Sequence, residues 1–136
     1  MTKTLSDFIQ EARHRVEEIS AEDLAELLAQ DADLLLVDIR EPYEHEKLHI
    51  PGCVLIPRGT LEGAADPNNK HRIEALYTAR DRTVVVYCET GARSALAADT
   101  LQQMGFEKVL NLAGGLKLWE AEDLDVASGP YTGPLP

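Results

Sequence analysis

One stretch of the sequence, residues 83–105, constrains the fold more than any other. Its first part, Thr83–Tyr87, is β-branched and aromatic, which is typical of a buried strand. Over residues 94–104 apolar side chains recur at helical spacing, and Gly105 then provides a stop signal. The residues between these two segments, 88–93, must therefore turn the chain tightly from a strand into a helix.

This turn would give Cys88 a particular environment. A strand–loop–helix unit points successive backbone N–H groups into one concavity at the positive end of the helix. A cysteine at the base of that concavity should ionise readily, and the thiolate is its reactive form. A lone cysteine after a strand is also often a small buried hydrophobe, and Gly91 could be an ordinary turn residue. Cysteine, glycine and arginine within one short loop favour a ligand site, because open α/β sheets bind ligands at the carboxyl ends of their strands.

Length and charge narrow the classes of protein. The chain has 136 residues, enough for one domain with a real core, and a net charge of -11, which argues against nucleic acid and anionic membranes as partners. An anionic substrate would have to be attracted by a local field. No apolar run reaches the length of a membrane span, and the first residues lack the apolar segment of a secretory signal. Two cysteines make no disulfide framework, so we expect a reducing, cytoplasmic location.

Strands and helices are predicted to alternate along the chain. This alternation predicts an α/β fold with a mostly parallel central sheet and helices on both faces, and with Thr83–Tyr87 near the centre. A loop with one helical turn near Leu61 is expected over 59–69, and an irregular tail over 128–136. Strands are predicted at 34–39, 50–56 (interrupted by Pro51 and Gly52), 83–87 and 108–110, and helices at 4–18, 20–30, 42–47, 71–79, 94–104 and 115–119.

The loop chemistry can be argued from its residues. A cup of backbone amides together with Arg93 favours anions such as a thiolate, a persulfide, thiosulfate or phosphate. We expect Glu89 to point outward, because an inward carboxylate would oppose a thiolate. The histidines at 45, 49 and 71 lie far off in sequence, so the loop has no evident general base. A thiolate alone suits sulfur exchange, whereas amide hydrolysis normally pairs cysteine with histidine.

Three blocks of the sequence resemble the single-domain rhodaneses, a family of sulfurtransferases. They are CETGARS at 88–94, LLLVDIREPYEHEKLHIPGCVLIP at 34–57 and NLAGGLKLW at 111–119, and together they cover about residues 19–122. The second block matches the family pattern through Asp38, Arg40, Glu44, His49, Ile50 and Gly52. Two positions depart from the pattern, with Leu48 where glycine is frequent and Cys53 where alanine is common. Cys53 is interpreted as a small buried filler, with a second thiol that resolves the persulfide as the alternative.

The resemblance implies a rhodanese-like domain at 19–124, a helical extension at 1–18 and a tail at 125–136. It implies that Cys88 takes a sulfane sulfur from a small anionic donor, such as thiosulfate, and passes it to a thiol or another nucleophile. A protein could be that acceptor. Neither a metal nor an organic cofactor is implied. Arg93 would help to orient the donor and to fix the loop. The implied substrate-binding residues are Glu89, Thr90, Gly91, Ala92, Arg93 and Ser94.

Other polar residues are expected to support the site. Asp38 and Arg40, at a strand end, are interpreted as an ion pair that braces the loop. Arg58 could line the pocket mouth or lie exposed, and His49 could hydrogen-bond backbone beneath the loop. Trp119 is expected to anchor the core. The spacing of histidines and cysteines matches no zinc pattern.

Two other functions stay open from the sequence. A related class, the cysteine phosphatases, uses C-x5-R, whereas Cys88 and Arg93 make C-x4-R, a shorter cup that should exclude phosphate. A persulfide carrier or a regulatory binding module with slow free turnover is the second alternative, and the intact cysteine and arginine do not exclude it.

Overall fold

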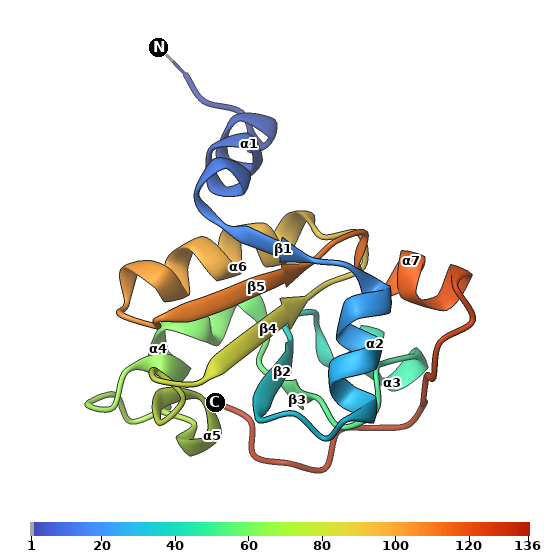
Figure 1. Ribbon diagram of the computed structural model, residues 1–136. Coiled ribbons are helices and arrows are strands. Elements are labelled where there is room, and N and C mark those ends of the chain that lie inside the picture. Colours follow the sequence, from blue (N-terminus) through green and yellow to red (C-terminus); the bar gives the residue numbers. More distant parts are fainter. Residues whose placement is uncertain (1) are drawn as a thin grey trace.

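The computed structural model describes residues 2–136, so Met1, the first residue of the predicted extension, lies outside the described part. A single parallel sheet of five strands organises the molecule, in the order β1-β5-β4-β2-β3 (Figure 1). The central position predicted for Thr83–Tyr87 is confirmed, because β4 has two strands on each side. The strands are β1 (Glu17–Ile19), β2 (Leu34–Asp38), β3 (Val54–Leu55), β4 (Thr83–Tyr87) and β5 (Lys108–Leu112).

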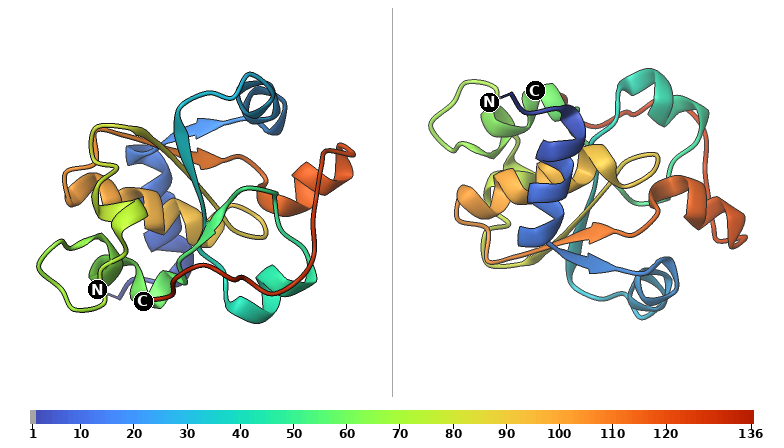
Figure 2. Two further views of the ribbon diagram at one scale, coloured as in Figure 1. Left: turned by 90° about the horizontal axis from the view of Figure 1, so that it is seen from below. Right: turned by 90° about the horizontal axis from the view of Figure 1, so that it is seen from above.

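Helices cover both faces of the sheet, as the alternation of elements predicts. One face carries α2 (Ala21–Ala29) and α7 (Gly115–Ala121), and α2 lies in front of the sheet in Figure 1. The opposite face carries α4 (Leu61–Ala65), α5 (Glu74–Tyr77) and α6 (Ala92–Gln103). The N-terminal helix α1 (Leu5–Arg15) packs across the outer side of α6 (Figure 2). The remaining elements are α3 (Pro42–Lys47) and the 3-10 turn η1 (Arg58–Thr60).

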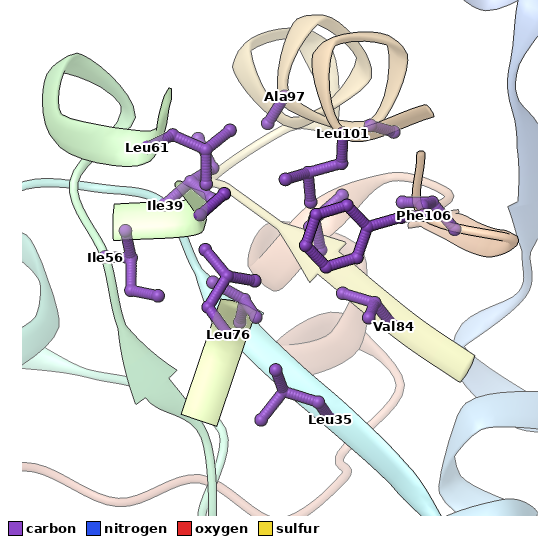
Figure 3. Close-up of a cluster of buried hydrophobic side chains, with 14 of the residues drawn as sticks. Leu35, Ile39, Ile56, Leu61, Leu76, Val84, Ala97, Leu101 and Phe106 are labelled. Atoms are coloured by element: carbon purple, nitrogen blue, oxygen red, sulfur yellow. The ribbon is translucent and has the colours of Figure 1, made fainter. Parts of the chain in front are cut away.

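The two faces have separate cores because successive side chains of a strand point in opposite directions. In β4, Val84 and Val86 join the cluster beneath α6, whereas Val85 and Tyr87 join the cluster beneath α2 and α7. Figure 3 shows the first cluster, in which Leu101 of α6 lies among side chains from several elements. Truncating such a fully buried leucine to alanine costs about 2–5 kcal/mol, so Leu101 is one of the residues that fix α6 to the sheet.

The connections leave the sheet in opposite directions next to its centre. The chain passes from β2 outward to β3, and from β4 outward to β5 on the other side. The last residues of the two inner strands, Asp38 and Tyr87, are direct partners in register. Divergent connections open a crevice above the carboxyl ends of such strands, which is where doubly wound sheets bind ligands. Cys88 is the first residue beyond β4 and therefore lies at this crevice.

The N-terminal segment differs from the prediction. The helix expected over 4–18 begins after the N-cap Thr4, whose side chain forms a capping box with Asp7, but it ends at Arg15. Val16 is extended, and β1 then adds to the edge of the sheet beside β5. The prediction was wrong here because a three-residue strand derives its stability from pairing with β5, which no local pattern reveals.

Other boundaries moved for similar reasons. The helix predicted over 71–79 is only the single turn α5, and the extended segment predicted over 50–56 pairs only at β3. In contrast, the strand predicted over 108–110 continues to Leu112, because Asn111 and Leu112 find partners in β1. Helix α3 has the bounds expected from its proline start. Within residues 2–136 no helix combines the length and apolar content needed to cross a bilayer.

Candidate active site

The Cys88 loop (residues 88–93) joins the end of β4 to the start of α6. Gly91 is the N-cap of α6 and has a φ of 97°, in the left-handed region that glycine adopts without strain. The helix starts at Ala92, two residues earlier than the sequence pattern suggested. Cys88 therefore sits at the base of a tight turn against a helix N-terminus, as predicted from the strand–loop–helix pattern.

Backbone amides converge on the sulfur of Cys88. The N–H of Gly91 lies 3.2 Å from Sγ and the N–H of Ser94 lies 3.4 Å from it. The Ser94 hydroxyl oxygen is 3.3 Å from the same sulfur. Cys88 is only 1% exposed, so the two backbone amides act where water competes little. The arrangement favours negative charge on a sulfur at this position.

The N-terminus of α7 supports the loop from behind. The N–H groups of Leu116 and Lys117 donate to the carbonyl oxygens of Cys88 and Glu89 at 2.9 and 3.0 Å. Gly115 permits this close approach, because a Cβ at that position would lie 2.6 Å from the carbonyl oxygen of Cys88. Gly115 belongs to the third sequence block, but its contact with the Cys88 loop could not be predicted from the sequence.

Asp38 and Arg40 form a buried ion pair beside the loop. The Arg40 Nε and Nη2 atoms donate to the two Asp38 carboxylate oxygens at 3.0 and 2.9 Å, and Nη2 also donates to the Leu48 carbonyl oxygen at 2.6 Å. Arg40 Nη1 reaches the carboxylate of Glu89 at 3.3 Å. Glu89 therefore directs its charge to Arg40, outward from the sulfur, as expected.

Arg93 is turned toward α3. Its two terminal nitrogens donate to the two carboxylate oxygens of Glu44 at 2.8 and 2.9 Å. The hydrogen bonds from Arg93 lower the pKa of Glu44 to about 2, and the same contact raises the pKa of Arg93. This guanidinium thus fixes the end of the loop to α3. The sequence showed both residues but gave no sign that they pair.

Two residues outside the predicted set support the loop from β5 and β1, Asn111 by direct contact and Glu18 through Asn111. Asn111 in β5 is fully buried, and its side-chain nitrogen donates to the Gly91 carbonyl oxygen at 3.0 Å and to the Glu18 carboxylate at 2.9 Å. Its amide oxygen accepts from the Ser94 hydroxyl at 2.5 Å. Asn111 lies in the third sequence block, whereas Glu18 lies in β1, which the sequence analysis assigned to a helix.

A cation from the N-terminal helix also approaches the loop. Arg13 of α1 is exposed, and its Nη2 lies 3.7 Å from the position that a Cβ on Gly91 would occupy. Arg58, by contrast, is directed to Glu62 and to Thr100 in α6, at 2.9 and 3.1 Å, and makes no hydrogen bond with the Cys88 loop. Of the remaining predicted rim residues, Thr90 is exposed and Ala92 is half-buried.

The second cysteine lies on the other face of the sheet. Cys53 packs with the core beneath α2 and α7, whereas Cys88 belongs to the core beneath α6. The Cys53 sulfur is 3.3 Å from the Tyr87 hydroxyl, and burial raises the pKa of this thiol to about 12. A direct exchange between the two sulfurs would have to cross the sheet, so the resolving role considered for Cys53 has no geometric support.

One cluster has the side chains of a metal site. Ligand atoms of Asp38, His45 and Cys53 lie within 4.8 Å of one another, a juxtaposition that the sequence spacing did not reveal. However, the Asp38 carboxylate already accepts hydrogen bonds from Arg40 and from the Tyr87 hydroxyl and lies 3.0 Å from Nδ1 of His45. The cluster is therefore satisfied by internal polar contacts. Burial also lowers the pKa of His45.

Two further sequence predictions concern residues near this cluster. His49 Nδ1 lies 2.7 Å from the backbone oxygen of His45, a backbone hydrogen bond of the kind considered for His49. Trp119 is buried against the core, as expected, and its indole N–H donates to the carbonyl oxygen of Asp125 at 2.8 Å. Neither side chain hydrogen-bonds the Cys88 loop, so both support the structure around the site.

Comparison with known proteins points in one direction. A family model described as a rhodanese-like domain matches residues 20–122. A sulfurtransferase of Allochromatium vinosum is 37% identical over 113 residues, which cover 83% of this chain and 96% of that protein. The putative sulfur carrier protein YrkF of Bacillus subtilis is 36% identical over 104 residues, which cover 76% of this chain. The chain spans about half of YrkF, because the matched segment is 51% of its length.

Solved structures include a similar molecule of nearly the same extent. A Rhodopseudomonas palustris protein of unknown function, described as a possible tyrosine phosphatase, has a TM-score of 0.87 and 32% identity. The match covers 93% of this chain and 96% of that one, more than residues 20–122 alone. A thiosulfate sulfurtransferase of Pseudomonas aeruginosa has a TM-score of 0.69 at 22% identity, over 92% of this chain and 22% of that one, a likeness that shows the fold alone.

Proposed function

Because the chain belongs to the rhodanese-like family, we propose that it is a sulfurtransferase that carries a sulfane sulfur on Cys88. The observation that supports this most directly is the convergence of the Gly91 and Ser94 amides on the Cys88 sulfur. Within residues 2–136 neither an imidazole nor a carboxylate hydrogen-bonds that sulfur. A lone thiolate suits sulfur exchange, in which the attacking anion and a good leaving group suffice.

The proposed cycle has two displacements. With thiosulfate as donor, the Cys88 thiolate attacks the outer sulfur, and sulfite leaves with the electron pair of the broken S–S bond. Cys88 is then a persulfide, whose terminal sulfur carries the negative charge. A thiolate or cyanide attacks this terminal sulfur, forms a new bond to it and releases the Cys88 thiolate. No net oxidation occurs, because each S–S bond that breaks is replaced by one new bond to sulfur.

The loop residues have separate proposed roles in this cycle. The amides of residues 89–94 hold the charge of the thiolate and of the persulfide, and Glu89 and Thr90 form the rim that the donor meets. Arg93 keeps the loop closed through Glu44, and Asp38 with Arg40 braces its other side. The division into an extension (1–18), a domain (19–124) and a tail (125–136) stays a proposal, as does a cytoplasmic location, whose reducing conditions would keep Cys88 a free thiol between turnovers.

The direct test is thiocyanate formation from thiosulfate and cyanide. The wild type should form thiocyanate, and mass spectrometry after incubation with thiosulfate alone should show one added sulfur on Cys88. The Cys88→Ser variant should lose both signals, whereas Cys53→Ser should keep them. Equal rates for the wild type and Cys88→Ser would refute the proposal.

A persulfide carrier is the second candidate, favoured by the similarity to the putative sulfur carrier YrkF. In that case Cys88 would gain one sulfur, yet release it slowly to small thiols and rapidly to a protein acceptor. A phosphatase activity is the contrary outcome to examine. The C-x4-R spacing from Cys88 to Arg93 leaves a short cup, so hydrolysis of an aryl phosphate should be absent, and ready turnover would overturn the assignment.

A further inference from the structure

We propose that Glu18 and Asn111 are positioning residues that control where the hydroxyl proton of Ser94 points, and thereby how readily Cys88 becomes a thiolate. Ser94 touches the sulfur, whereas Glu18 and Asn111 act through it. The inference rests on the proposed function in one respect, namely that Cys88 is the reactive thiol. It assigns a role to Glu18, which lies outside the segment matched by the family model.

The orientation of the Asn111 amide is determined by its neighbours. Its side-chain nitrogen lies 3.0 Å from the Gly91 carbonyl oxygen and 2.9 Å from a carboxylate oxygen of Glu18. Both neighbours are acceptors, so both N–H groups are used and the amide oxygen must face Ser94. A charged acceptor on one end of an amide polarises it, which makes the oxygen at the other end a stronger acceptor.

The Ser94 hydroxyl has one proton and two neighbours that can accept it. The Asn111 amide oxygen is 2.5 Å away and the Cys88 sulfur is 3.3 Å away. A hydroxyl donates a single hydrogen bond, so the shorter contact takes the proton and leaves a lone pair directed at the sulfur. This state suits a Cys88 thiol, whose S–H can donate to the Ser94 oxygen.

Formation of the thiolate changes this requirement. When the Cys88 proton leaves to solvent, the Ser94 hydroxyl stabilises the anion only by rotating from Asn111 to the sulfur. Glu18 opposes that rotation because it strengthens the competing acceptor. After sulfur transfer the charge moves to the outer persulfide sulfur, and Ser94 can return its proton to Asn111. Glu18 and Asn111 therefore favour the thiol and the loaded persulfide over the free thiolate.

The other charges around the loop are arranged in contacts that do not involve Asn111. Replacing Glu18 therefore leaves those contacts in place. These contacts are the ion pairs of Arg93 with Glu44 and of Arg40 with Asp38 and Glu89. The remaining charge near the loop is Arg13, which approaches Gly91 from α1.

The test uses the full chain and measures the pH profile of Cys88 alkylation by iodoacetamide, with no sulfur donor present. Glu18→Ala should raise the rate at pH 7 by about threefold, because the weakened Asn111 acceptor then competes less with the thiolate for the Ser94 proton. Glu18→Gln keeps an acceptor oxygen and should give a smaller increase. Glu17→Ala is the matched control, since it removes the same charge from the adjacent strand residue, whose side chain points to the opposite face. It should leave the profile unchanged.

A second background separates positioning from simple charge. In Ser94→Ala, adding Glu18→Ala should have no further effect on the alkylation rate. An equal increase in both backgrounds would mean that Glu18 acts through space, and an unchanged rate in every Glu18 variant would mean that it does not act; either result overturns the proposal. Circular dichroism establishes whether each variant is folded. If Glu18→Ala is unfolded, Glu18→Gln takes its place in the comparison. If the Glu18 variants change the alkylation rate as expected but the wild type forms no thiocyanate, only the proposed function is contradicted.

Discussion

Glu44 and Arg93 form a two-pronged ion pair that joins α3 to the last residue of the Cys88 loop. The two residues are 49 positions apart, and the pair links the segment that follows β2 to the segment that follows β4. In the proposed cycle, Arg93 is therefore already bound to a carboxylate when the donor arrives. Its main effect in the resting protein is to hold the loop, and an incoming anion must compete with Glu44 for it.

Loss of this pair should make the protein less stable in a pH-dependent way. Glu44→Gln should lower the free energy of unfolding by about 1 kcal/mol at pH 7, a modest value because Arg93 is partly exposed to solvent. Arg93 lowers the pKa of Glu44 from 4.5 to about 2, so the stabilisation is complete above pH 4.5 and is lost as the pH falls toward 2. Urea unfolding at several pH values measures the difference between wild type and variant.

The neighbouring Glu46→Gln is a suitable control, because Glu46 lies exposed on the same helix. It should unfold like the wild type at every pH. A difference between wild type and Glu44→Gln that stays constant from pH 7 to pH 2 would contradict the role given to the Arg93 contact.

Replacement of Gly115 should damage the loop from behind. A Cβ at this position would meet the carbonyl oxygens of Cys88 and Glu89 at 2.6 and 2.5 Å, and its φ of 60° also disfavours alanine. Gly115→Ala should therefore cost about 2 kcal/mol of stability or more and reduce sulfur loading of Cys88 at least tenfold. Gly59→Ala, where no atom lies within 4 Å, should leave both unchanged. Thermal unfolding and intact mass after thiosulfate treatment report the two effects.

The two cysteines should differ sharply in reactivity. Burial raises the pKa of Cys53 from 9 to about 12, so the folded protein holds this residue as a neutral thiol. Its contribution to stability is complete below pH 9 and is lost as the pH rises toward 12. Iodoacetamide at pH 8 should label Cys88 and spare Cys53, and addition of urea should make both reactive. Peptide mass spectrometry over time gives the two rates. Comparable labelling of both thiols in the folded protein would show that Cys53 is less protected than its environment indicates.

Arg13 should assist an anionic donor. Its guanidinium lies beside Gly91, in a protein whose net charge of -11 otherwise repels anions. Arg13→Ala should slow sulfur loading from thiosulfate by about threefold at low ionic strength, and the difference should vanish near 1 M salt, where the screening length falls to about 3 Å. Lys108→Ala removes a cation at the start of β5, at the opposite end of the sheet from the Cys88 loop, and should have little effect. Mass spectrometry of samples quenched at successive times measures the rate at which the persulfide forms.

The parts of the fold that the sequence revealed are those set by local pattern. The apolar run of β4, the proline start of α3 and the turn glycine Gly91 each carry their own signal. The strand β1 carries none, because three residues become a strand only when β5 is beside them. For the same reason the helix predicted over 4–18 is too long, since α1 ends at Arg15.

The candidate site divides in the same way. The position of Cys88 follows from one short loop, so its place at a helix N-terminus was predictable. The contacts that hold the loop come from elsewhere, from Glu44 in α3 and Asn111 in β5, and Glu18 of β1 in turn binds Asn111. Each depends on register and packing between distant segments. Side-chain pairing of this kind has no local signature, which is why the sequence suggested that Arg93 helps to fix the loop without revealing Glu44 as its partner.

The separation of Cys53 and Cys88 by the sheet has a consequence under oxidative stress. A peroxide that converts the Cys88 thiolate to a sulfenic acid leaves it with no thiol partner inside the described chain, because Cys53 lies on the far side of β4. Protection from irreversible sulfinic acid formation must then come from outside, by capture with a small thiol or a reductase. The proposed persulfide would itself protect Cys88, since its outer sulfur is the one that is oxidised and can afterwards be removed by reduction.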